Sequence, residues 1–311
     1  MTQKPSTCVF SYCAHLLFSS ATLPDAALSF LVMSKMSTPF IPKQAVKIDE
    51  SLFRELDNDI TEFVANSLIA NDLPAFRSDS IVHDNGCGSG AVTRGIIATD
   101  PPSGIQIHAT DISSTLAAQA TAGIDLSWSI KAESMDAQNL TFPDDMFSHS
   151  VTAFVFASVP DTVAASKEIR RTLKPGGTAA IAVWDDSPTN TALEQAHQKI
   201  RGYDTPVLPV ISRLTYQQTH LDKALKEAGW NDVEYVKKEA WLSLGTDIKR
   251  WATLIWSLGG APAGGWTQQD EDRWDETVGM IVAYVEGHEW HRVEEGVHKI
   301  RMVASVGIGR K

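Results

Sequence analysis

The amino-acid sequence predicts an α/β protein whose doubly wound sheet is followed by a helical lid. Three observations lead to this prediction. Short apolar strands alternate with helical segments between residues 80 and 184. A glycine-rich turn follows the first of these strands, as in folds that bind a cofactor at the carboxyl ends of parallel strands. Aromatic helical segments then replace this alternation in the second half of the chain.

Composition and charge restrict the class of partner. The chain has 311 residues, of which 43% are hydrophobic and 21% charged, as in a globular protein with a sizeable core. Its formal charge of −11 at pH 7 disfavours nucleic acid and anionic membranes, so we expect a small-molecule partner. Cys8, Cys13 and Cys87 lack the spacing of a zinc site. We therefore expect no metal and a reducing, cytoplasmic environment.

The first 78 residues divide into an arm and a helical cap. Residues 8–18 are apolar, but a single Lys4 precedes them and polar residues follow, which is unlike a secretory signal or a membrane span. Met33 and Met36 offer alternative starts, so we expect residues 1–35 to lie outside the working core. Within the cap, residues 36–78, apolar side chains recur at helical spacing from residue 49 to residue 70 and predict one amphipathic helix.

The cofactor-binding core is predicted to span residues 79–185. Its alternating elements indicate parallel strands joined by crossover helices. Strands are expected at residues 80–84, 105–110, 127–131, 148–156 and 178–184, and helices at residues 91–98, 115–122 and 163–173. Pro175-Gly176-Gly177 is expected to separate the last helix from the last strand.

The remaining residues, 186–311, are predicted to form a helical substrate lid with completing strands. Helices are expected at residues 190–201, 215–228, 246–258 and 269–286, and strands at residues 233–238 and 299–308. Tryptophan is concentrated here, at Trp241, Trp251, Trp256, Trp266, Trp274 and Trp290. Flat aromatic faces of this kind can hold a cyclic or aromatic metabolite, although many buried tryptophans serve only as core.

The turn Asp84-Asn85-Gly86-Cys87-Gly88-Ser89-Gly90 carries the strongest functional signal. Its alternate glycines let a ligand approach the backbone, and the helix that follows attracts an anion. The turn also satisfies the dinucleotide pattern Gly-x-Gly-x-x-Gly/Ala, with Asp111 about 20 residues further on. The glycines alone therefore leave a dinucleotide and an amino-acid-like cofactor open.

Features outside the glycines favour S-adenosylmethionine. Asp84 would repel a pyrophosphate and attract the ammonium and sulfonium groups of that cofactor. After the third strand, the Asp136 carboxylate can accept a hydrogen bond from an adenine amino group while Met135 packs on the ring. The sequence also lacks the Tyr-x-x-x-Lys pair of the short-chain dehydrogenases.

These segments resemble the class I S-adenosylmethionine-dependent methyltransferases, especially the small-molecule branch related to the quinone-biosynthesis enzymes. The resemblance covers about residues 80–185. Five segments carry it in order, namely residues 82–90, 108–113, 135–137, 142–147 and 173–177. It implies a seven-stranded sheet with an antiparallel last strand, for which residues 299–308 are placed.

The resemblance also assigns residues to the cofactor. Asp111 is expected to bind the ribose hydroxyls, Ile112 and Met135 to enclose the adenine, and Asp136 to hold its amino group. The other expected cofactor residues are Asp84, Gly86, Cys87, Gly88, Gly90, Ala137 and Phe156. Cys87 is interpreted mainly as a small packing residue of the turn. Asn85 departs from the leucine or isoleucine that is usual in the family.

The methyl acceptor is expected over the carboxyl ends of the strands, beneath the lid. The residues expected to contact it are Ala157, Trp184, Trp251 and Trp256. No pattern identifies a catalytic base; five histidines are candidates only because they titrate, namely His149, His197, His220, His288 and His291.

The sequence therefore predicts methylation of a thiol, hydroxyl or amine on a small cyclic or aromatic metabolite, in secondary metabolism or detoxification. Two alternatives remain open at this point. One is an NAD(P)-dependent oxidoreductase, and the other is a catalytically silent regulator that keeps the methyltransferase fold.

Overall fold

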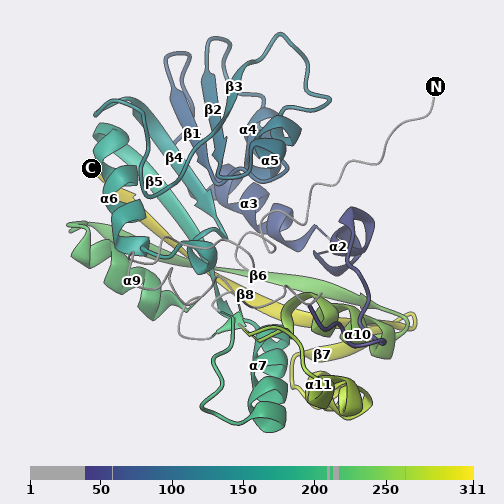
Figure 1. Ribbon diagram of the computed structural model, residues 1–311. Helices are drawn as coiled ribbons and strands as arrows, with labels where there is room; N and C mark the ends of the chain where they lie inside the picture. Colours follow the sequence, from purple (N-terminus) through teal and green to yellow (C-terminus); the bar gives the residue numbers. More distant parts are fainter. Residues whose placement is uncertain (1–38, 58, 209–210, 213–216, 263) are drawn as a thin grey trace.

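The computed structural model describes residues 39–57, 59–208, 211–212, 217–262 and 264–311 (Figure 1). The expectation for the arm, residues 1–35, lies outside this range. Two helices open the described chain, α2 (Glu50–Asp57) and α3 (Ile60–Asn71), where the sequence predicted one. The helix is interrupted because Asp59 adopts a left-handed φ of 56°. Aspartate tolerates that conformation better than most side chains.

The core follows the predicted alternation of strands and helices. Its first half contains β1 (Ile81–Asn85), α4 (Ala91–Ala98), β2 (Gln106–Asp111), α5 (Ser114–Ala120) and β3 (Ser129–Ser134). Its second half contains β4 (Phe147–Ala153), the short 3-10 helix η2 (Phe156–Ser158), α6 (Thr162–Thr172) and β5 (Leu173–Asp186).

Two boundaries in the core differ from the prediction. β4 ends at Ala153 because the next residue, Phe154, has a left-handed φ of 60° that no strand can continue. β5 begins at Leu173, so Pro175-Gly176-Gly177 lies inside the strand instead of ending the helix ahead of it. The register between β4 and β5 shifts at this point, and the irregularity accommodates the proline.

The second half of the chain holds the lid helices and the last strands. The elements are α7 (Pro188–Arg201), α9 (Gln218–Glu227), β6 (Val233–Gly245), α10 (Ile248–Gly259), α11 (Gln268–Asp272), α12 (Trp274–Glu286), β7 (His291–Glu294) and β8 (Val297–Arg310). The predicted helix over residues 269–286 is divided at Arg273, and β7 was not predicted.

The sheet has the topology that the sequence analysis expected. Its strands follow the order β3-β2-β1-β4-β5-β8-β6, and the short β7 pairs with β8 outside this path. β1 to β5 are parallel, whereas β8 runs antiparallel to both β5 and β6. The predicted antiparallel last strand is confirmed. β6 and β8 extend from the core into the lid half of the molecule (Figure 1).

Helices cover both faces of the sheet. α3 and α4 bury Leu68, Val82 and Ile96 on one face. α6 and α9 bury Ile169 and Leu221 on the other. A separate apolar cluster joins the lid helices to the ends of β6 and β8. Phe154 and Trp184, at the carboxyl ends of β4 and β5, pack against this cluster, so this edge of the sheet faces the lid.

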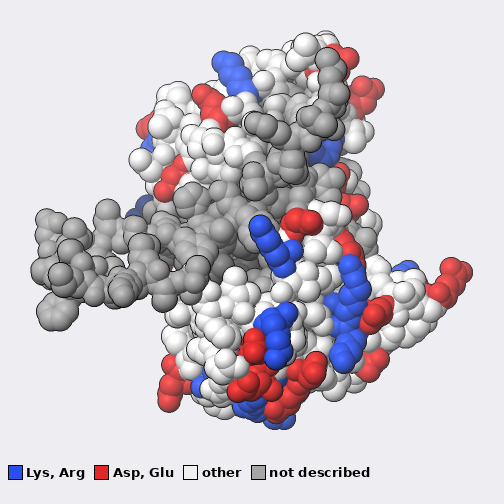
Figure 2. Space-filling view, turned by 45° about the vertical axis from the view of Figure 1, so that its right-hand side comes forward, with Lys and Arg blue, Asp and Glu red and all other residues white. Residues whose placement is uncertain are grey.

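Over the lower half of the face shown in Figure 2, Lys and Arg side chains are set among Asp and Glu. In the described part of the chain, no helix combines the length and the apolar character that crossing a membrane requires.

Candidate functional site

The glycine turn is anchored to the neighbouring strand. The Gly86 and Cys87 N–H groups both donate to the Thr110 carbonyl oxygen, each at 2.8 Å. The Gly90 N–H donates to the Cys87 carbonyl oxygen at 2.8 Å, which closes the turn just before α4. The backbone path from β1 to α4 is therefore set by β2, at the carboxyl edge of the sheet.

The three glycines serve different purposes. A Cβ on Gly86 would lie 2.3 Å from Val155 Cγ2, and one on Gly90 would lie 2.6 Å from the Ala120 oxygen. Both positions also have positive φ, so close packing and conformation require glycine there. A Cβ on Gly88 would meet no described atom within 4 Å. Gly88 is thus the position of the three that offers open backbone to a ligand.

Asp84 lies beneath the turn. It is 1% exposed, and its Oδ2 accepts bonds from the Thr93 N–H at 3.0 Å and the Thr93 hydroxyl at 2.7 Å. Gly90, the N-cap of α4, has no capping side chain, so Asp84 satisfies an N–H that the helix leaves free. Burial raises the pKa of Asp84 to about 7, against the effect of the two Thr93 bonds. Contact between this carboxylate and a cofactor cation stays a prediction.

Asp111 connects the end of β2 to the turn. Its Oδ2 accepts a bond from the Gly88 N–H at 3.0 Å, and its Oδ1 accepts one from the Ser113 N–H at 2.9 Å. Burial raises the pKa of Asp111, while these two backbone bonds lower it. The carboxylate therefore lies next to the open backbone of Gly88, where its predicted contact with ribose can form.

The predicted adenine residues gather around the ends of β2 and β3. Ile112 is 53% exposed, which is unusual for isoleucine and leaves an apolar surface open beside Asp111. The Met135 N–H donates to the Asp111 carbonyl oxygen at 2.9 Å, so Met135 is held close by. Asp136 Oδ1 accepts bonds from the Gln138 N–H at 2.8 Å and from its side-chain amide at 3.1 Å. The sequence analysis does not name Gln138 as a residue of the site.

Other predicted cofactor residues prove to be packing residues. Cys87 is buried with Ala109, Ala117 and Ala120, and burial raises the pKa of its thiol. Phe156 is 1% exposed and its side chain packs in the core with residues of α6, so its contact with the cofactor stays a prediction, and here only its backbone could make that contact. The sequence analysis gives no role to Val155, the residue before Phe156, whose side chain packs on Gly86. Ala137 is partly buried against the same core.

An aromatic pair marks the ends of β4 and β5. The rings of Phe154 and Trp184 stack with centroids 4.4 Å apart and an interplanar angle of 29°. Both side chains are half-buried and pack against the lid cluster. The sequence analysis names Trp184 as an acceptor contact but does not name Phe154. Ala157 lies in η2, half-buried at the same edge.

The two lid tryptophans that were predicted to contact the acceptor are buried. Trp251 is 4% exposed and Trp256 is 1% exposed, and both belong to the lid core. Arg201 lies over the Trp256 ring, 5.0 Å from its centroid, and forms a buried ion pair with Asp270 at 2.8 Å. Packing within the lid covers both rings, and their contact with a methyl acceptor stays a prediction.

The histidines separate into positions near and far from this edge. His220, in the first turn of α9, lies with Nε2 3.3 Å from the Thr162 hydroxyl at the start of α6. Burial lowers its pKa, which favours the neutral form. His149 instead contacts the Pro74 carbonyl oxygen at 3.2 Å, and His197 contacts that of Thr205 at 3.1 Å. His220 is thus the histidine of these three that lies at the carboxyl edge.

The arrangement fits S-adenosylmethionine. Open backbone at Gly88, a carboxylate at the end of β2 and an exposed apolar side chain at Ile112 lie together. They stand at the carboxyl edge of a sheet whose last strand is antiparallel. Fold and site are therefore those that the sequence analysis expects of a class I S-adenosylmethionine-dependent methyltransferase.

Comparison with known proteins agrees with this class. Residues 83–181 match the family model of the methyltransferase domain. The methyltransferase tpcH of Aspergillus fumigatus is 24% identical over 270 residues, which cover 81% of this chain and 93% of that protein. The ubiquinone/menaquinone biosynthesis C-methyltransferase UbiE of Rickettsia bellii is 26% identical over 205 residues, which cover 58% of this chain and 81% of that protein.

The fold has a counterpart among solved structures. The YcgJ protein of Bacillus subtilis superposes with a TM-score of 0.51 and 13% identity, covering 80% of this chain and 99% of that one. The chain thus carries a class I S-adenosylmethionine-dependent methyltransferase domain, as the sequence analysis expected. The oxidoreductase alternative has no support from these matches.

Proposed function

We propose that the protein transfers a methyl group from S-adenosylmethionine to a small cyclic or aromatic molecule bound between the carboxyl edge of the sheet and the lid. The observation that carries the proposal is the stacked pair of Phe154 and Trp184. Phe154 directly follows β4 and Trp184 lies near the carboxyl end of β5. A flat acceptor can stack on such a pair.

The position of Phe154 supports this assignment. Its φ of 60° is uncommon for a bulky residue and costs about 1–3 kcal/mol. The strain is held by a bond from the Phe154 N–H to the Ala182 carbonyl oxygen at 2.8 Å and by the stacking on Trp184. The next residue, Val155, packs on Gly86. The strained backbone thus connects the aromatic pair directly to the cofactor turn.

The reaction requires the protein mainly to position the two reactants and to exclude water from them. When bound, the cofactor supplies a methyl group on a sulfonium, which the acceptor atom attacks in line. Ile112 offers apolar surface to the bound cofactor, and Asp111 and Gly88 fix the orientation of the cofactor. Alignment of two reactants in this way can lower the barrier by about 7–11 kcal/mol. A thiol, hydroxyl or amine can serve as the acceptor in such a site.

We further propose a role in secondary metabolism or detoxification, because the lid is rich in aromatic residues and the chain is acidic. The likeness to the fungal methyltransferase tpcH supports a shared architecture in the lid as well as the core, since it covers 81% of this chain. Transfer to a protein or a nucleic acid would be a different function, which an acceptor panel detects.

The test is methyl transfer from isotopically labelled S-adenosylmethionine to a panel of phenols, thiols, amines and quinols, read by mass spectrometry. Once an acceptor is found, Phe154→Ala and Trp184→Ala are each expected to raise its KM by about tenfold or more, given the apolar area that each ring buries. S-adenosylhomocysteine affinity should stay unchanged. Trp241→Ala, a surface ring on β6, is the matched control and should leave both values unchanged.

Cofactor binding without turnover across the whole panel would favour the silent regulator instead. If the two aromatic variants weakened cofactor binding by the same factor by which they raised the KM for the acceptor, the pair would support the glycine turn and would not contact the acceptor.

A further inference from the structure

Consecutive residues of helix α4 contact the glycine turn and the helical cap. Thr93 bonds to Asp84 beneath the turn. The next residue, Arg94, reaches back past the N-terminal end of the helix, where its Nη1 donates to the Ser89 carbonyl oxygen at 2.7 Å. Its Nη2 donates to Glu62 Oε2 on α3 at 2.8 Å. A single guanidinium therefore joins the cap to the turn.

The peptide group between Ser89 and Gly90 is held on both sides. Its N–H donates to the Cys87 carbonyl oxygen at 2.8 Å, and its carbonyl oxygen accepts the bond from Arg94. Because a peptide group is planar, one bond on each side fixes its orientation. The residue before it, Gly88, offers the open backbone of the turn. Loss of the Arg94 bond would leave the peptide held on one side and loosen the backbone next to Gly88.

The cap lies close to α4 at the residue after Arg94. A Cβ on Gly95 would lie 2.4 Å from Asn66 Oδ1 and 2.8 Å from Ile69 Cδ1, both on α3. A larger residue would displace both side chains, so glycine lets the two helices approach closely here. This contact packs α3 on α4, and the Arg94–Glu62 pair holds the N-terminal end of α3 beside the turn.

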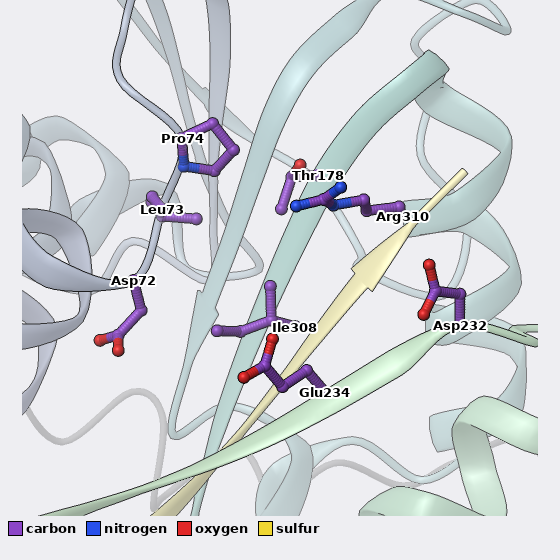
Figure 3. Close-up of a pocket in the computed structure, with 8 residues that line it drawn as sticks. All are labelled: Asp72, Leu73, Pro74, Thr178, Asp232, Glu234, Ile308 and Arg310. Atoms are coloured by element: carbon purple, nitrogen blue, oxygen red, sulfur yellow. The ribbon is translucent and has the colours of Figure 1, made fainter.

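The C-terminal end of α3 has an anchor of its own. Asp72, the C-cap of the helix, forms an ion pair with Lys238 of β6. Asp72 lies with Leu73 and Pro74 at one side of a cavity of about 450 Å³, which residues of β5, β6 and β8 also line (Figure 3). The helix is thus held by Lys238 at one end and by Arg94 at the other, so the two anchors can be tested separately.

We propose that Arg94 is a positioning residue for the cofactor. Its bond to the Ser89 carbonyl oxygen holds the turn in the orientation that binds S-adenosylmethionine, and Glu62 holds the guanidinium in place for that bond. Arg94 acts on the cofactor through the backbone of the turn and not through direct contact. Cofactor binding and docking of the cap are consequently coupled, because the same guanidinium serves both.

Calorimetric titration of S-adenosylhomocysteine into the full chain tests the proposal. Arg94→Gln removes the charge-assisted bond to Ser89 and should weaken binding by about fivefold. Glu62→Gln should also weaken it, by about threefold, because the guanidinium loses the partner that holds it over Ser89. A direct contact between Arg94 and the cofactor carboxylate predicts the opposite for Glu62→Gln, since that change removes a competing carboxylate.

Two further variants separate position from charge. Arg94→Lys keeps the charge, but an ammonium group lacks the planar fork with which arginine bonds two acceptors at once. Its affinity should therefore stay close to that of Arg94→Gln. The double variant of Arg94→Gln with Glu62→Gln should bind no more weakly than Arg94→Gln alone, because the two side chains act as one unit.

Lys238→Gln is the matched control, because it breaks the ion pair at the other end of the same helix. Its free energy of unfolding in urea should fall, since the mostly buried Asp72 carboxylate loses its partner. Its affinity for S-adenosylhomocysteine should equal that of the wild type. The same denaturation experiment shows that the Arg94 and Glu62 variants are folded under the conditions of the titration.

The proposal would be overturned by an unchanged affinity in Arg94→Gln, or by full affinity in Arg94→Lys or Glu62→Gln. An equal loss of affinity in Lys238→Gln would also overturn it, because cofactor binding would then follow the stability of α3 and not the orientation of Ser89. None of these titrations requires a methyl acceptor, so their outcome is independent of the proposed function.

Discussion

Replacement of Asp84 by asparagine removes the ionisable group under the cofactor turn and keeps its shape. The amide oxygen can still accept both bonds from Thr93, which are 3.0 Å and 2.7 Å long in the protein. Asp84 is 1% exposed, so its ionised form is poorly solvated. The substitution thus isolates the cost of charge at this position.

The pKa shift sets the direction and the size of the effect. Burial raises the pKa of Asp84 from 3.8 to about 7. The stabilising contribution of its protonated form is complete below pH 3.8, where the unfolded chain also holds the proton, and is lost as the pH rises to about 7. A shift of this size corresponds to a free-energy difference on the order of 4 kcal/mol. Asp84→Asn should therefore gain stability relative to the wild type as the pH rises.

Urea denaturation of both proteins between pH 5 and pH 8.5 measures this difference in the free energy of unfolding. The matched control is Asp100→Asn, which makes the same substitution at an exposed aspartate whose φ of 49° asparagine also tolerates. A difference for Asp84→Asn that does not change from pH 5 to pH 8.5 would refute the reasoning, because the carboxylate would then be ionised throughout at no cost.

The same variant tests the sequence-based role of Asp84 in cofactor binding. S-adenosylmethionine carries a sulfonium charge that S-adenosylhomocysteine lacks. If the Asp84 charge acts on that sulfonium, Asp84→Asn lowers the affinity ratio of the first to the second at pH 8. An unchanged ratio would leave Asp84 with only its structural role beneath α4.

Four further substitutions probe the turn and the lid. Asp111→Ala should weaken S-adenosylhomocysteine binding by at least about tenfold in calorimetry, because charge-assisted bonds to ribose are lost, and an unchanged affinity would remove Asp111 from the site. Gly86→Ala should lower Tm more than Gly88→Ala, since its Cβ would lie 2.3 Å from a neighbouring side chain whereas that of Gly88 enters open space; equal Tm losses would contradict this. Arg201→Met should cost about 3–5 kcal/mol in urea denaturation by leaving the buried Asp270 carboxylate unpaired, whereas a loss below about 1 kcal/mol would show that the pair is dispensable.

The core was predictable because its signals are local. α4 was expected at residues 91–98 and is observed at Ala91–Ala98, since Gly90 before it and the apolar spacing within it are read directly from the sequence. The antiparallel last strand was available only through the family resemblance. Helix breaks at Asp59 and Arg273 were missed because a single backbone conformation interrupts an otherwise continuous apolar pattern.

The site was predictable in part. Asp111, Ile112 and Met135 gather as expected because they lie at or directly after the carboxyl ends of two adjacent parallel strands. The contact between Thr93 and Asp84 was missed, although a signal existed: Gly90 cannot cap α4, so a free N–H in the first turn needs another acceptor.

The acceptor side depends on tertiary packing that sequence patterns do not carry. Trp184 and Trp256 are both tryptophans beyond the cofactor turn, yet one is half-buried at the sheet edge and the other lies in the lid core. Phe154 gave no signal as a site residue, because its role depends on a strained φ that interrupts an apolar strand pattern.

The central claim is that the turn from Asp84 to Gly90 binds S-adenosylmethionine. Its most direct test is calorimetric titration of S-adenosylhomocysteine into the wild-type protein, with NAD and NADP titrated in parallel. S-adenosylhomocysteine is expected to bind one-to-one with a Kd on the order of micromolar, and neither dinucleotide is expected to bind. One-to-one binding of NAD or NADP together with no binding of S-adenosylhomocysteine would contradict the claim.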